Sequence, residues 1–78
     1  MIAVNSTKPK LIAEKFDGLQ RDGISFKVHK IIGMSVILDI DGDIAKAKKM
    51  IPGIAKEIPE FKYIFAHPME VDENGRVI

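Results

Sequence analysis

The stretch ISFKVHKIIGMSVILDID, residues 24–41, decides the fold of this 78-residue chain. Two sets of apolar residues recur there at every second position: Ile24, Phe26 and Val28, then Val36, Leu38 and Ile40. A period of two is typical of strands with one buried face, and Gly33 offers a turn between them. We therefore predict an antiparallel hairpin. If both apolar sets share a face, paired residue numbers sum to an even value, and a sum near 66 places Lys27 opposite Asp39.

Helical spacing precedes this hairpin. Ile12, Phe16 and Leu19 follow one another at intervals of four and three, which predicts an amphipathic helix. Pro9 stands where the first turn of a helix tolerates proline, with Ser6 or Thr7 as its cap. The pair at residues 22–23, Asp-Gly, is predicted to end this helix, since glycine readily adopts positive φ.

A second helix is predicted after the hairpin, with Asp41-Gly42-Asp43 at its beginning. Its apolar stripe comprises Ile44, Ala47, Ile51, Ile54, Ala55 and Ile58. Pro52 lies inside this pattern and removes one backbone hydrogen bond, so we expect a kink or two short helices.

Strands are also predicted at the two ends of the chain. Met1–Val4 is the first, and Phe61–His67 is the last, with Pro68 either breaking it or placing it at a sheet edge. The order predicts an α+β fold, a ferredoxin-like βαββαβ two-layer sandwich with both helices on one face of an antiparallel sheet. We expect one domain over residues 1–78, with residues 72–78 as either a short hairpin around Asn74-Gly75 or a frayed tail. The predicted shared core contains Phe16, Phe26, Leu38, Ile51 and Phe65.

Residues 36–43, VILDIDGD, resemble the first motif of haloacid-dehalogenase-type phosphatases. The resemblance implies Asp39 as nucleophile and Asp41 as general acid and base. Asp43 replaces the threonine of that motif, and the family needs a parallel sheet in a longer chain. We interpret the string as a strand that runs into a helix cap, and we predict no catalytic residue.

The same carboxylates have the alternate spacing of a calcium loop, but its glycine is misplaced and Met50 stands where a bidentate Glu is required. His29 and His67 have no zinc-ligand spacing, and the chain has no cysteine. We therefore predict no metal and no cofactor.

Strand alternation leaves one sheet face without helices, and we predict that function lies there. The predicted interaction face comprises Lys27, His29, Ile37, Asp39, Ile64 and Ala66. Exposed isoleucines on adjacent strands often mark association surfaces. The sequence therefore favours a non-enzymatic interaction or regulatory domain that acts as a homodimer or an accessory subunit. The alternative is a small-molecule-binding regulatory domain; a nucleic-acid binder is less favoured, because the aromatic residues follow the core stripes.

A basic face is predicted on the second helix, formed by Lys46, Lys49 and Lys56. It is either a solvated surface or a contact for phosphate or an acidic partner. The absence of cysteine favours a reducing, cytoplasmic location. No apolar run is long enough to predict a membrane span.

Overall fold

The alternating stretch forms two long antiparallel strands, β3 (Ile24–Ile32) and β4 (Ser35–Asp41). Lys27 pairs with Asp39, so the predicted register is confirmed over the first half of the hairpin. A β-bulge between Val28 and Lys30 then shifts the register by one residue. The bulge reverses the faces of the last residues of β3, which the uniform alternation in the sequence did not predict.

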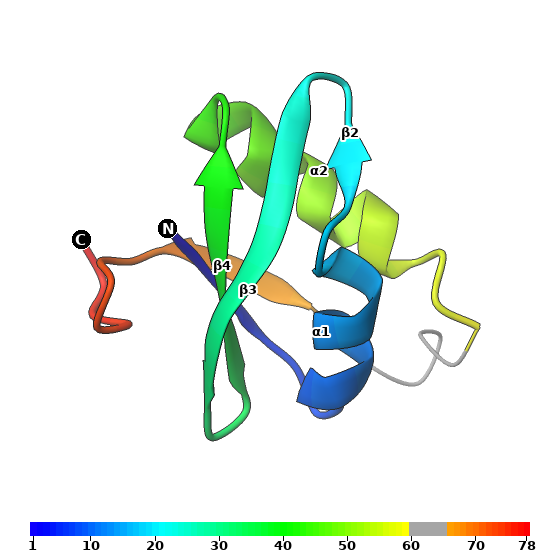
Figure 1. Ribbon diagram of the computed structural model, residues 1–78. Helices are drawn as coiled ribbons and strands as arrows, with labels where there is room; N and C mark the ends of the chain where they lie inside the picture. Colours follow the sequence, from blue (N-terminus) through cyan, green and yellow to red (C-terminus); the bar gives the residue numbers. More distant parts are fainter. Residues whose placement is uncertain (60–65) are drawn as a thin grey trace.

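The computed structural model describes residues 1–59 and 66–78. Within these residues, helix α1 (Pro9–Phe16) precedes the hairpin and helix α2 (Ile44–Ala55) follows it. Three short strands complete the sheet: β1 (Ile2–Asn5), β2 (Gln20–Arg21) and β5 (His67–Glu70). All pairings are antiparallel, in the order β2-β3-β4-β1-β5 (Figure 1). The chain is thus an α+β domain with an open five-strand sheet and two helices over its described residues.

The predicted four-strand ferredoxin-like arrangement is wrong in one respect: the order of the five strands is not the standard one for that fold. The difference arises at Asp22 and Gly23, which were expected to end the first helix. Both residues have positive φ, 53° and 78°, and they form a two-residue turn between β2 and β3. Such a turn suits the twist of a hairpin, so Asp-Gly here adds an edge strand.

Helix α1 ends earlier than expected, at Phe16, and Gly18 follows with φ +79°. Pro9 is at its beginning, as predicted. No side chain caps its first turn; instead the Ser6 hydroxyl accepts a hydrogen bond of 3.1 Å from the Lys8 N–H. The predicted Ser6 or Thr7 cap is therefore wrong.

Helix α2 runs through Pro52 as one helix instead of two short ones. At its beginning, an Asp43 side-chain oxygen accepts a hydrogen bond of 3.2 Å from the Lys46 N–H, which confirms the acidic cap. Gly42, with φ +136°, lies so close to Ile24 that a Cβ atom at this position would be 3.0 Å from Ile24 Cγ1. The turn into α2 therefore requires glycine for both conformation and space.

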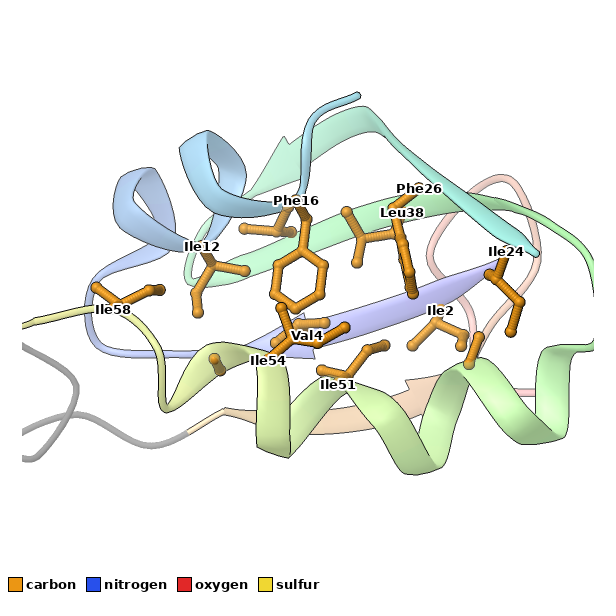
Figure 2. Close-up of a cluster of buried hydrophobic side chains, with 13 residues drawn as sticks. Ile2, Val4, Ile12, Phe16, Ile24, Phe26, Leu38, Ile51, Ile54 and Ile58 are labelled. Carbon is orange, nitrogen blue, oxygen red and sulfur yellow. The ribbon is translucent and has the colours of Figure 1, made fainter. Parts of the chain in front are cut away.

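The main core lies between the helices and one face of the sheet, as Figure 2 shows. Phe16 of α1 meets Phe26 of β3 edge to face, with ring centroids 5.4 Å apart. Leu38 and Ile51 belong to the same cluster, so four of the five predicted core residues are confirmed. The fifth, Phe65, lies outside the described residues.

Of the two alternatives expected for residues 72–78, the structure has the hairpin, in which Val71 and Val77 form an isolated antiparallel bridge. A carboxylate oxygen of Asp72 accepts hydrogen bonds from the backbone N–H groups of Asn74 and Arg76, at 2.9 and 3.0 Å. These bonds depress the pKa of Asp72 below its ordinary value, with the Arg76 N–H as the main cause. Figure 1 shows this segment, in red, on the side of the sheet away from the helices.

Candidate interaction surface

The sheet face opposite the helices is covered in its middle by the C-terminal hairpin. Ile37 points toward this face, as predicted, but only 1% of it is exposed. It forms a second small cluster with Ala3 and Val71, against which Met1 packs. A Cβ atom on Gly75 would lie 3.4 Å from Ile37 Cδ1, so the hairpin turn rests directly on this side chain. The expectation that Ile37 is exposed is therefore wrong.

Ala66 and Ile64 are two other predicted members of the interaction face. Ala66 is half-buried and packs against the main core, so its predicted place on the helix-free face is wrong. The next residue, His67, begins β5. The register of β5 places Ala66 and His67 on the opposite faces of the sheet from those expected for the strand predicted at Phe61–His67. Ile64 lies outside the described residues.

The polar members of the predicted face are exposed. Lys27 and Asp39 lie opposite each other on β3 and β4, and His29 is the extra residue of the bulge.

Pro68 lies in β5 at the edge of the sheet, where the missing N–H of proline is tolerated. The predicted edge position of Pro68 is therefore confirmed.

Exposed apolar side chains gather at the far end of the β3–β4 hairpin. Ile31, Ile32 and Met34 are 45%, 47% and 56% exposed, and we call these three residues the apolar arm. Gly33 has φ +58° as the first of the two turn residues at the tip of this hairpin, at the bottom of the view in Figure 1. The bulge turns Ile32 toward the helix-free face, where its Cδ1 would lie 3.2 Å from a Cβ on Gly75. The apolar arm thus extends beyond the hairpin that covers Ile37.

The sequence contained a signal for the apolar arm. Ile31 and Ile32 are adjacent, and a strand places adjacent side chains on opposite faces, so one of the two leaves the core side at any register. The remaining exposed large apolar side chains of the described residues are Val77 and Ile78, at the C-terminus.

The lysines of the predicted basic face are all exposed. Lys46 and Lys49 are exposed on the helix, and Lys56 is exposed at its C-terminal cap. Lys46 Nζ donates a hydrogen bond of 3.4 Å to the Asp22 carbonyl oxygen, which connects the helix to the β2–β3 turn. This contact gives Lys46 a local partner within the fold.

An ion-pair cluster joins Glu57, just after α2, to Lys15 of α1 and Arg21 of β2. Glu57 accepts hydrogen bonds of 3.1 Å from Lys15 Nζ and from Arg21 Nη2. Hydrogen bonding to Arg21 is the main cause that lowers the pKa of Glu57 to about 2, and Lys15 adds to it. All three side chains are partly exposed, so the cluster contributes modestly to stability.

Two open hollows lie beside α1. The first, of about 360 Å³, is lined by Leu11, Glu14, Lys15, Glu57, Ile58 and Pro59. The second, of about 330 Å³, is lined by Ala13, Glu14, Asp17 and Val28, beside the outer edge of β3. Within residues 1–59 and 66–78 no group of three or more acidic or histidine side chains is arranged to hold a metal ion. In the same part of the chain, no helix is long and apolar enough to cross a membrane.

No family model, no curated protein and no solved structure matches this chain.

Proposed function

We propose that this chain is a non-enzymatic interaction domain that associates with a second copy of itself through the apolar arm. The supporting observation is the exposure of Ile31, Ile32 and Met34 together at one end of a long hairpin. Complete burial of an isoleucine or methionine side chain is worth about 1.5–3 kcal/mol relative to full exposure, and roughly half of each of these side chains is still exposed. Burial of this surface against a partner would therefore stabilise the association.

The surroundings of the arm support a specific contact. Lys27, Lys30 and Asp39 lie further along the same two strands, so both signs of charge flank the apolar residues. A two-fold contact brings the same surface patch of each copy together, and a patch with both signs can complement itself. The four longer strands and the two helices support a variant of the ferredoxin-like arrangement to which β2 adds an edge strand. We place the domain in the cytoplasm because it has no cysteine.

The test is analytical ultracentrifugation of the wild type and of Ile32→Lys at matched concentrations. We expect the wild type to self-associate and Ile32→Lys to remain folded but associate more weakly, since a charge replaces an exposed apolar contact. Ala45→Lys is the matched control, because Ala45 is exposed on α2 and receives the same charge. A wild type that stays monomeric up to about 1 mM would refute the proposal.

A further inference from the structure

The outer edge of β3 changes character at Val28. Before this residue the edge is occupied: β2 pairs with Ile24 and Ser25, and the Phe26 N–H donates a hydrogen bond of 2.7 Å to the Leu19 carbonyl. The Val28 N–H donates to a carboxylate oxygen of Asp17, at 3.2 Å. Beyond Val28, no described residue pairs with the outer edge of β3.

The free edge has its backbone groups directed outward at Ile31. The Ser6 N–H donates a hydrogen bond to the Met34 carbonyl oxygen. The backbone N–H and C=O groups of the even-numbered residues of β4 are therefore directed toward β1, and those of the odd-numbered residues toward β3. Ile32 and Lys30, which pair with Ser35 and Ile37, are therefore the residues of β3 that bond to β4. The N–H and C=O groups of Ile31 consequently point away from the sheet.

Side chains at this edge are apolar on both faces. Ile31 pairs with Val36 of the main core and so lies on the helix side, whereas Ile32 lies on the other side with Ile37. An added strand would therefore find an exposed apolar neighbour on each face of the sheet, together with unpaired backbone groups.

We infer that the free edge of β3 pairs with the same edge of a second copy, antiparallel and centred on Ile31. This inference rests on the proposed function and specifies its geometry. With Ile31 opposite its counterpart, Lys30 lies opposite Ile32 of the other copy. A shift of the centre by one residue toward the N-terminus would place Lys30 opposite itself, and facing like charges are destabilising.

The same register keeps the helices of both copies on one side, because its two-fold axis is perpendicular to the sheet. The two sheets would become one continuous sheet. Val28, where the free edge begins, lines the hollow of about 330 Å³ that also contacts Ala13, Glu14 and Asp17.

Ile31→Pro tests the pairing in the full chain. Proline removes an N–H that β4 does not use, so the monomer should fold, which circular dichroism would verify. We expect the dimer dissociation constant to rise roughly tenfold, because two backbone hydrogen bonds are lost. Ile78→Lys is the control: Ile78 is 83% exposed, and its substitution should leave the constant unchanged.

Ile31→Lys provides a second test that does not alter the backbone of the edge. Two lysines would then lie opposite each other at the centre of the pairing, so the dimer should weaken. Mixing Ile31→Lys with Ile31→Glu should restore much of the affinity by pairing opposite charges.

Dimers unaffected by both Ile31→Pro and Ile31→Lys, but weakened by Ile32→Lys, would refute the edge pairing and leave the proposed function standing. A monomeric wild type would refute both.

Discussion

Truncation of Ile37 to alanine should destabilise the domain far more than truncation of its neighbour on the same face, Ile32. Ile37 is 1% exposed and lies beneath the C-terminal hairpin, whereas Ile32 is 47% exposed. Removing a buried isoleucine side chain down to its Cβ costs about 2–5 kcal/mol, because transfer and cavity terms add. We expect Ile37→Ala near the lower end of this range, since the short hairpin above it can partly collapse into the space.

Urea denaturation followed by circular dichroism measures both variants against the wild type. A loss of about 2 kcal/mol or more is a large share of the stability of a domain this small. For Ile32→Ala we expect a loss below about 1 kcal/mol, because less apolar area leaves contact with the protein. Amide exchange at Val71 and Gly75 should also accelerate in Ile37→Ala, since these residues cover the substituted site. If Ile37→Ala and Ile32→Ala cost the same small amount, the C-terminal hairpin does not cover the sheet.

Four further outcomes follow from individual contacts. Leu38→Ala should cost about 2–5 kcal/mol in thermal or urea unfolding, because Leu38 is fully buried in the main core; melting within a degree or two of wild type would contradict that placement. Gly42→Ala should lower the melting temperature, since alanine meets both a positive φ and a close contact; an unchanged value would show that the turn relaxes freely. The pKa of Glu57 is depressed from its ordinary 4.5 to about 2, so its pair with Arg21 stabilises the fold above pH 4.5 and is lost as the pH falls toward 2; an NMR titration midpoint near 4.5 would refute the pair. Asp39→Asn should leave any hydrolysis of a generic phosphomonoester unchanged, and loss of a measurable activity would restore the phosphatase interpretation.

Local patterns were sufficient for the elements that bury one continuous stripe. The period of two at residues 24–41 and the stripe of α2 both predicted the correct partners in the core, because each side chain's face follows from its position in the repeat. The residues that cap α2 were likewise recognisable, since Asp43 precedes the first helical residue.

Features that depend on a choice between turns were not predictable in the same way. Asp22-Gly23 suits either the end of a helix or a hairpin turn, and only the pairing of Gln20 with Ser25 decides between them. The bulge at His29 leaves no mark in the alternation of apolar residues, yet it decides which of Ile31 and Ile32 faces the helices.

Ile37 was predicted on the correct face of the sheet, but it was expected to be exposed and is buried. Strand parity directs Ile37 away from the helices, but it carries no information about a hairpin that begins more than thirty residues later and folds over it. The exposed apolar side chains are instead at the end of the β3–β4 hairpin, where the C-terminal hairpin covers Ile32 only in part.

Sedimentation equilibrium of the wild-type chain across a range of concentrations measures self-association itself. We expect a reversible monomer–dimer equilibrium that Ile32→Lys shifts toward monomer and Ala45→Lys does not. A single monomeric species up to about 1 mM, or a dimer that both variants leave equally intact, would contradict self-association through the apolar arm.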